Sequence, residues 1–149
     1  MDYFYIMPLP QDLALEIANQ WRYQAPLDVY TISAHPKTYA EMISPGARGD
    51  RFFAVIRNAA LMGYFCMDQV GEVVELRLGM KPSLTGQGNG RAFYQTIEDY
   101  LVEHVQPASI KLTVASSHQV AQKLFHALGF TETEKQAEYI KMEKKLVCD

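Results

Sequence analysis

The sequence predicts an α/β fold in which a central mixed sheet of about six to seven strands carries helices on both faces. Two observations lead to this fold class. Strands joined by short turns occupy the middle of the 149-residue chain, whereas strands and helices alternate toward its end. Hairpins pair strands antiparallel, while a strand–helix–strand unit places its strands in parallel, so together they make a mixed sheet.

The part of the chain before residue 81 supplies four strands and two helices. Leu13, Ile17 and Trp21 recur at four-residue spacing, which indicates an amphipathic helix that Pro26 ends. Asn58-Ala59-Ala60 separates two apolar runs and indicates a hairpin. The expected strands are Tyr3–Pro8, Arg51–Arg57, Leu61–Met67 and Glu72–Met80, and the expected helices are Asp12–Tyr23 and Pro36–Ile43.

The rest of the chain alternates helices with strands. Phe93, Ile97 and Leu101 lie on one side of a helix. A later amphipathic helix begins after Ser117, its expected cap, and stops at Gly129, a residue typical of the position after a helix. The expected helices are Arg91–His104 and Gln119–Leu128, and the expected strands are Ser109–Ala115 and Glu138–Leu146.

Length and composition favour one globular domain over residues 1–149, with 48% hydrophobic residues available for a core. No apolar run reaches about 18 residues and Asp2 stands near the N-terminus, so we expect neither a membrane span nor a signal peptide. Cys66 and Cys148 do not make a disulfide framework. A net charge of −3 disfavours nucleic acid as a partner. We therefore expect a cytoplasmic monomer or homodimer.

The most informative segment is VVELRLGMKPSLTGQGNG, residues 73–90, in which an apolar strand leads into a glycine-rich turn and then a helix. Gly86, Gly88 and Gly90 allow positive φ angles and let backbone N–H groups approach a ligand closely. The N-terminus of the next helix adds unpaired N–H donors and a partial positive charge. Together these features predict an anion site suited to a diphosphate.

Two common diphosphate loops do not fit this spacing. A Walker A loop ends in Gly-Lys-Ser/Thr, whereas Gly90 is followed by Arg91. A dinucleotide fingerprint needs a glycine at the position of Arg91. The segment Thr85-Gly86-Gln87-Gly88-Asn89-Gly90 instead resembles motif A of the GNAT N-acetyltransferase superfamily, Q/R-x-x-G-x-G/A, with Thr85 in place of the usual Gln or Arg.

A second block, residues 114–130, resembles motif B of the same family, a strand followed by N-x-x-A-x-x-x-Y-x-x-x-G-F. Ala121, Gly129 and Phe130 match it, whereas His118 replaces the Asn and Phe125 replaces the Tyr. The resemblance extends over nearly the whole chain and implies that the motif A and motif B strands splay apart.

The same resemblance implies transfer of an acetyl group from acetyl-CoA to a primary amine, without a covalent acyl-enzyme. The implied contacts with the pyrophosphate and its surroundings are made by Thr85, Gly86, Gln87, Gly88, Asn89, Gly90, Arg91 and His118. The pantetheine arm is expected to pair with the backbone of Leu78 and Met80 in the gap between the strands, where fixed dipoles polarise the thioester carbonyl.

We expect Glu75 to be the general base, because an ammonium cannot attack a thioester until its proton moves to a carboxylate, usually through water. Glu75 is the lone acid of residues 73–78. We expect its strand to be covered on both faces, which makes a carboxylate more basic. Arg77 follows at i+2 on the same face, so a structural ion pair is the alternative role for Glu75.

The acceptor amine is expected near Trp21, Tyr23, Asp28 and Tyr30, since aromatic rings beside a carboxylate can bind an ammonium. The alternative is that Trp21 ends the apolar stripe of its helix and the tyrosines only pack the loop. None of His35, His104, His118 and His126 has metal-ligand spacing to a partner, so we expect no metal.

Three functions stay open from the sequence. The first is acetylation of a small-molecule amine. The second is acetylation of a protein N-terminus or lysine, which needs an open groove in place of a closed pocket. The third is an acyl-CoA-binding module without activity, which the replacement of the motif B tyrosine by Phe125 makes credible.

Overall fold

A computed structural model describes residues 1–146 of the protein, so Cys148 lies outside the described residues. Seven strands form one sheet in the order β1-β2-β3-β4-β5-β7-β6. The strands are β1 (Phe4–Pro8), β2 (Phe52–Arg57), β3 (Ala60–Val70), β4 (Val73–Met80), β5 (Ser109–Ala115), β6 (Thr131–Lys135) and β7 (Tyr139–Lys145). Only β4 and β5 pair in parallel, which confirms the predicted mixed sheet.

The helices confirm the predicted order and refine their ends. The α-helices are α1 (Gln11–Gln20), α2 (Pro36–Ile43), α3 (Pro45–Arg48), α4 (Gly90–His104) and α5 (Gln119–Ala127), and the 3₁₀ turns are η1 (Leu27–Tyr30), η2 (Ile32–Ala34) and η3 (Pro82–Leu84). Within residues 1–146, no helix is both long and apolar enough to cross a membrane.

Three local predictions needed correction. α1 ends at Gln20, because Trp21 turns into an extended conformation and buries its ring beside Tyr64. His118, not Ser117, precedes the first turn of α5, and no side chain caps that helix. The edge strand β6 was not predicted, since its sequence TETEK is exposed throughout and lacks the apolar alternation of a strand with one buried face.

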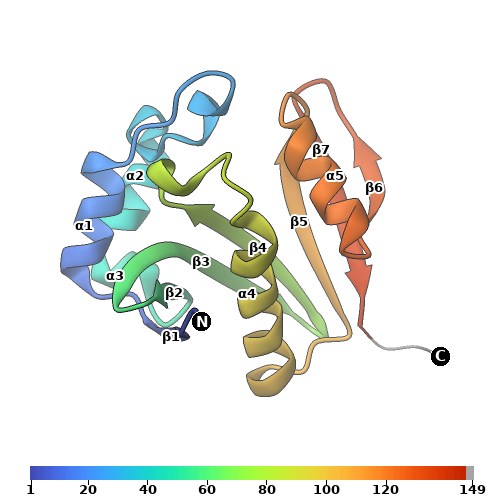
Figure 1. Ribbon diagram of the computed structural model, residues 1–149, viewed down its shortest axis with the longest axis horizontal. Helices are drawn as coiled ribbons and strands as arrows, with labels where there is room; N and C mark the ends of the chain where they lie inside the picture. Colours follow the sequence, from blue (N-terminus) through green and yellow to red (C-terminus); the bar gives the residue numbers. More distant parts are fainter. Residues whose placement is uncertain (147–149) are drawn as a thin grey trace.

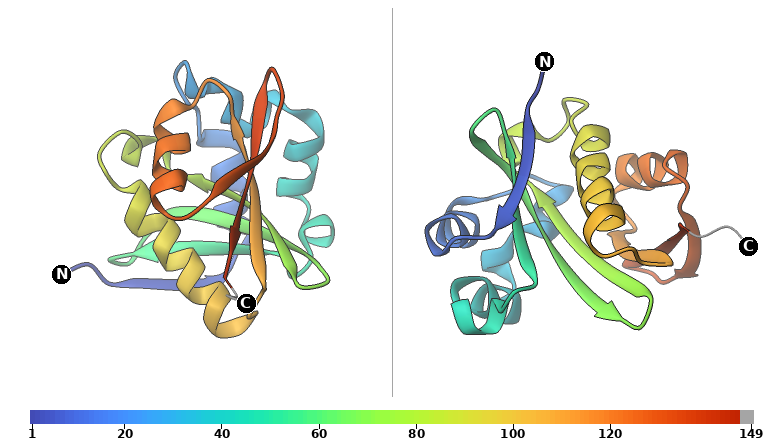
Figure 2. Two further views of the ribbon diagram at one scale, coloured as in Figure 1. Left: turned by 90° about the vertical axis from the view of Figure 1, so that its right-hand side faces the viewer. Right: turned by 90° about the horizontal axis from the view of Figure 1, so that it is seen from below.

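Helices lie on both faces of the sheet (Figures 1 and 2). A hydrophobic core is buried on each face. On one face, α4 and α5 pack against inward side chains of β2 to β5 and β7. On the other face, the buried core of α1, η2 and α2 includes strand residues of β2 and β3 only. Within residues 1–146, β4 to β7 contribute no buried hydrophobic residue to this second core.

The sheet opens between its two parallel strands. β4 and β5 pair only where Val73–Glu75 meets Ser109–Lys111, and beyond that point their ends diverge (Figure 1). β5 continues into β7 and β6 as a separate arm. The divergence confirms the splayed sheet that the sequence resemblance implied. It also leaves the facing backbone edges of both strands without a strand partner.

Candidate active site

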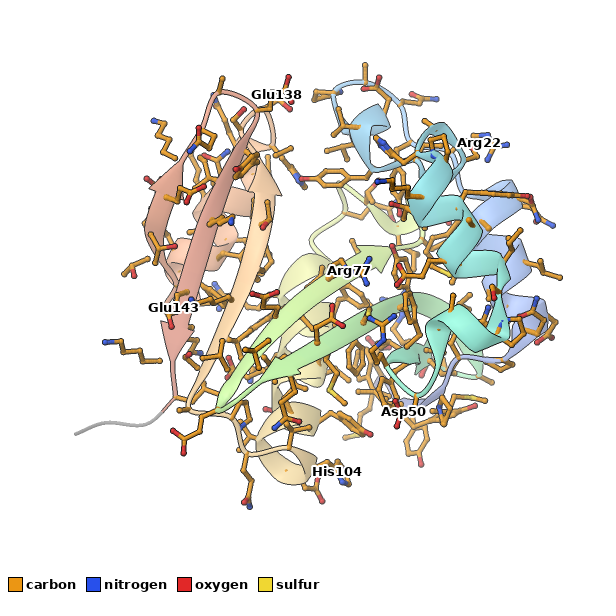
Figure 3. The ribbon with its side chains drawn as sticks, turned by 180° about the vertical axis from the view of Figure 1, so that it is seen from behind. Arg22, Asp50, Arg77, His104, Glu138 and Glu143 are labelled. Atoms are coloured by element: carbon orange, nitrogen blue, oxygen red, sulfur yellow. The ribbon has the colours of Figure 1, made fainter. Side chains whose placement is uncertain are left out.

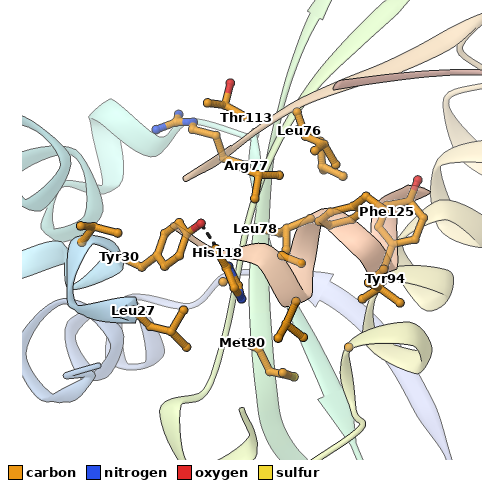
Figure 4. A pocket seen from close by; sticks show the side chains of 18 of the residues that line it. Leu27, Tyr30, Leu76, Arg77, Leu78, Met80, Tyr94, Thr113, His118 and Phe125 are labelled. Atoms are coloured by element: carbon orange, nitrogen blue, oxygen red, sulfur yellow. Dashed lines mark hydrogen bonds between the residues drawn. The ribbon is translucent and has the colours of Figure 1, made fainter. Parts of the chain in front are cut away.

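A cleft of about 1570 Å³ occupies the space between the diverging strands. Its walls are the C-terminal half of β4, the edge of β5, the glycine turn and the facing sides of α4 and α5. Residues 21–38 and parts of β3, β6 and β7 form the remaining walls (Figure 4). This single cavity therefore brings together the turn of motif A, the first turns of motif B and the loop expected to bind the acceptor.

The register identifies which backbone groups face the cleft. The N–H of Lys81 donates to the carbonyl of Met62 on β3, at 2.8 Å. Because alternate residues of a strand bond to opposite edges, Leu78 and Met80 direct their N–H and C=O groups away from β3 and toward β5. These are the residues whose backbone was expected to contact pantetheine, and the register supports that expectation.

The non-glycine residues of the glycine turn fold back onto η3. The Thr85 hydroxyl donates to the carbonyl of Pro82 at 2.7 Å. The side-chain amide of Gln87 donates to the carbonyl of Ser83 at 2.8 Å, and the side-chain amide of Asn89 donates to the carbonyl of Leu84 at 2.9 Å. Gly86 and Gly88 adopt φ angles of 72° and 79°, as the turn requires. The turn is therefore fixed by its own side chains before any ligand binds.

Backbone donors are unpaired along this turn and into the helix. Within residues 1–146, none of the N–H groups of residues 86–92 makes a well-aligned hydrogen bond to a protein acceptor. The first turn of α4 carries Arg91 and no acidic residue, the reverse of what the helix dipole favours. Both features are expected at a site for an anion with several oxygens.

Gly90 requires a different explanation from the other two glycines. Its φ is not positive, and it begins α4. A Cβ atom there would lie 2.9 Å from Cδ2 of Leu124, so the lack of a side chain allows α4 to approach α5 closely. The role in positive-φ turn geometry that we expected for Gly90 therefore belongs to Gly86 and Gly88.

Two tyrosines of the N-terminal loop each bond one backbone group that the splay leaves without a strand partner. The hydroxyl of Tyr23 donates to the carbonyl of Met80 at the end of β4. The hydroxyl of Tyr30 accepts from the N–H of Ala115 at the end of β5, at 3.0 Å. The loop thus spans the cleft at its wide end, and the carbonyl of Met80 is not free for a ligand.

Tyr30 also meets His118 across the cleft (Figure 4). The phenol oxygen lies 3.2 Å from Nδ1 of His118, and the ring centroids are 5.5 Å apart. Burial raises the pKa of Tyr30 and lowers the pKa of His118, so both side chains are neutral at neutral pH. The pair is a neutral hydrogen-bonded bridge.

Replacing Tyr30 with phenylalanine should lower the free energy of unfolding by about 1 kcal/mol, because the Ala115 N–H loses its acceptor. A lower urea midpoint at constant m value would report this loss. Tyr39→Phe is the matched control, since its hydroxyl bonds an exposed side chain, Oδ1 of Asn19, at 2.7 Å. Equal midpoints for the two variants would contradict the bridge.

Trp21 and Asp28, the other residues expected to bind the acceptor, differ in where the structure places them. Trp21 lines the cleft but is 4% exposed, and its indole N–H donates to Glu16 at 3.2 Å. Its burial agrees with the alternative prediction, in which Trp21 is the last apolar residue on the core-facing side of the first helix. Asp28 is exposed and is not among the residues that line the cleft. Gln87, which was expected near the pyrophosphate, does not line the cleft either. The aromatic residues therefore approach the cleft without the carboxylate expected beside them.

Glu75 lines the cleft on the face that α1 and α2 leave uncovered. The expectation that both faces of its strand are covered is wrong, because Glu75 and Arg77 are exposed while Val74 and Leu76 are buried. The register places Glu75 beside Lys111, at the last paired position before β4 and β5 diverge. The carboxylate is thus at the closed end of the cleft and open to solvent.

Arg77 does not pair with Glu75. Its guanidinium lies 3.0 Å from Glu41 and 3.7 Å from Asp68, and it also donates to Sγ of Cys66 (Figure 3). Burial alone would raise the pKa of Glu41, but hydrogen bonds from Arg77 and Arg51 lower it. This network on the outer face of the sheet leaves Glu75 without an ion-pair partner within residues 1–146.

The sequence model of the Acetyltransferase (GNAT) family matches residues 15–130. The chain belongs to the GNAT acetyltransferase family. Membership confirms the enzyme class that motifs A and B predicted. Among curated proteins, no sequence matches the chain.

Several solved structures share the GNAT fold of this chain. A chimera of spermidine N-acetyltransferase SpeG from Vibrio cholerae and hSSAT is 17% identical, with a TM-score of 0.76 over 95% of each chain. The N-acetyltransferase PseH from Campylobacter jejuni, in complex with acetyl coenzyme A, is 17% identical, with a TM-score of 0.71 over 99% of this chain and 100% of PseH. The PaiA N-acetyltransferase from Thermoplasma acidophilum, in complex with coenzyme A, is 19% identical, with a TM-score of 0.68 over 96% and 99%.

The residue at the GNAT tyrosine position, Phe125, lines the cleft and is 6% exposed. Its ring packs edge-on against Tyr94 and Phe130, with centroids 5.5 and 5.3 Å away. Tyr94 cannot replace the missing phenol, because its hydroxyl donates to the buried carboxylate of Glu98, at 2.9 Å. Within residues 1–146, no group of three or more His, Cys, Asp or Glu side chains forms a candidate metal site.

Two features of this GNAT site escaped the sequence analysis. Arg57 of β2 donates to Oδ1 of Asn89, at 2.9 Å, and Tyr30 bonds both Ala115 and His118. Both contacts join residues that are far apart in the sequence, and no spacing or motif in the chain indicates them. Only the position of Tyr30 in an aromatic loop gave a general signal.

Proposed function

We propose that this GNAT protein transfers the acetyl group of acetyl-CoA to a primary amine of a small molecule, by direct attack while both substrates are bound. The observation that carries the proposal is the run of unpaired N–H groups over residues 86–92, which opens into the cleft between two unpaired strand edges. The turn suits a diphosphate and the β4 edge suits an extended amide chain. A CoA thioester contains both a diphosphate and an extended amide chain.

The residues present fit the donor. Gly86, Gly88 and the first turn of α4 offer N–H groups to the pyrophosphate, and Arg91 adds a cation beside them. Leu78 offers a backbone N–H and a carbonyl to the pantetheine arm, whereas Met80 offers its N–H alone, because Tyr23 occupies its carbonyl. When bound, acetyl-CoA supplies the acetyl group as a thioester.

The reaction needs a proton to leave the ammonium before its nitrogen can attack. Glu75 receives that proton through water, which the exposed face of β4 admits. A nitrogen–carbon bond then forms as the carbon–sulfur bond breaks, the thiolate leaves, and the proton that the new amide nitrogen loses passes through water to that thiolate. Backbone N–H groups on the β4 edge are fixed dipoles that stabilise the charge on the carbonyl oxygen.

Restoring the family tyrosine, Phe125→Tyr, should change kcat by less than about tenfold, below the usual contribution of a general acid. An alkyl thiol has a pKa of about 8.5, so its thiolate leaves adequately without an acid. The measurement is kcat against pH for both proteins with the same amine. A gain of about 100-fold in kcat for the variant would show that the natural protein lacks a needed acid. That result would favour an acyl-CoA-binding module without activity.

The bridge between Tyr30 and His118 supports a small acceptor over a protein segment, because it closes the wide end of the cleft. The test is release of free thiol from acetyl-CoA with a panel of amines, amino acids, polyamines and peptides. Spermidine belongs in it, because a spermidine N-acetyltransferase has the same fold. Turnover of peptides alone would favour a protein acceptor. CoA binding without turnover of any member would favour a binding module.

A further inference from the structure

We infer that Arg57 is a positioning residue of the diphosphate site and that it acts by keeping the side chain of Asn89 from capping α4. This inference rests on the proposed use of acetyl-CoA, whose pyrophosphate would take the N–H groups that such a cap would otherwise occupy. Arg57 is at the end of β2 and is not among the residues that line the cleft.

Asn89 is in the position from which an asparagine normally caps a helix. It immediately precedes α4, and asparagine is among the residues most strongly preferred there, because its oxygen accepts from the N–H groups of the first turn. Yet its side chain makes no capping hydrogen bond. Its φ and ψ angles are −82° and −14°, whereas a capping residue is usually extended.

Both polar atoms of the Asn89 side chain make hydrogen bonds away from the first turn of α4. Its oxygen accepts from Nη1 of Arg57 at 2.9 Å, and its amide nitrogen donates to the carbonyl of Leu84 at 2.9 Å. Arg57 joins none of the ion pairs within residues 1–146, so its guanidinium is available for this contact. The contact connects residues that are 32 positions apart, which makes it a tertiary constraint on the turn.

Without Arg57, the freed oxygen of Asn89 would compete with a ligand for the same donors. Gly88 and Gly90 flank Asn89, so the backbone has the freedom to move toward a capping conformation. A cap formed in this way would stabilise the free helix and occupy an N–H group that the anion needs. Arg57 therefore favours the ligand-ready form of the turn without touching the ligand.

The test is calorimetric titration of Arg57→Met with CoA, together with thermal unfolding of the free variant. We expect CoA to bind about fivefold more weakly, the equivalent of one capping interaction. We expect the melting temperature of the free variant to stay unchanged or to rise. Arg22→Met is the matched control, because it removes the same charge from an exposed position outside the cleft and should bind CoA as the natural protein does.

The double variant Arg57→Met/Asn89→Ala distinguishes competition from a direct charge effect. Alanine cannot cap, so the double variant should bind CoA within about twofold of Asn89→Ala alone. Binding by the double variant about fivefold weaker than that by Asn89→Ala, or equal losses in Arg57→Met and Arg22→Met, would overturn the inference. A lower melting temperature for free Arg57→Met would also overturn it. Failure of the natural protein to bind CoA would instead overturn the proposed function.

Discussion

Replacing Glu75 with glutamine should lower turnover by about 100-fold or more while CoA binding is retained, because the amide keeps the shape of the side chain but accepts no proton. The acidic limb of kcat/KM against pH should flatten in the same variant. The exposed position of Glu75 means that water connects it to the acceptor. Calorimetry with CoA and steady-state kinetics on one preparation measure both effects.

Glu143→Gln is the matched control for this prediction. Glu75 on β4 and Glu143 on β7 both neighbour Lys111 of β5, from opposite sides, and Glu143 is outside the residues that line the cleft. Turnover should be nearly unchanged there. Unchanged turnover in Glu75→Gln would exclude Glu75 as the base. It could not then be assigned to an ion pair with Arg77, because Arg77 pairs with Glu41 and Asp68.

Replacing Gly88 with alanine should abolish the rise in melting temperature that CoA causes in the natural protein. A ligand at about 100 times its Kd stabilises a protein by about 2.7 kcal/mol, so the rise is readily measured. Gly88 has a φ of 79° and open space around its missing Cβ. The substitution therefore acts through backbone strain, which moves the N–H groups of the turn, and not through a clash.

Gly71→Ala is the matched control for strain. Gly71 has a φ of 62°, also has open space around it, and is in the turn between β3 and β4 outside the cleft. It should lower the melting temperature of the free protein to a similar extent and leave the CoA-induced rise intact. If Gly88→Ala responds to CoA as Gly71→Ala does, the turn is not the diphosphate site.

Features that depend on neighbouring residues were predictable from the sequence. The hairpin at Asn58-Ala59 forms as expected, with both residues at positive φ in a two-residue turn. α5 ends at Ala127, and Gly129 follows two residues later with a φ of 102°, as expected for the glycine after a helix. The glycine turn after β4 likewise follows from residue types at fixed spacing. Such signals are local because backbone sterics and helix periodicity act over a few residues.

Other features depended on which elements cover which face of the sheet. The sequence of β4 does not reveal that α1 and α2 cover the sheet only as far as β3, so the exposure of Glu75 could not be predicted. β6 escaped prediction for a related reason. Its pairing with β7 comes from backbone hydrogen bonds along an exposed edge, and these leave no pattern of apolar side chains.

The sequence by itself determined the family, the order of the elements and the glycine turn with its unpaired donors, because each follows from short-range spacing. The tertiary structure alone decided how the site is completed. It joined Tyr30 to Ala115 and His118, and Arg57 to Asn89, across separations of 85, 88 and 32 residues. The physical reason is that these contacts join residues far apart in the sequence, so they form only where the folded chain brings their elements together, as at the backbone N–H of Ala115 that the splayed sheet leaves unpaired.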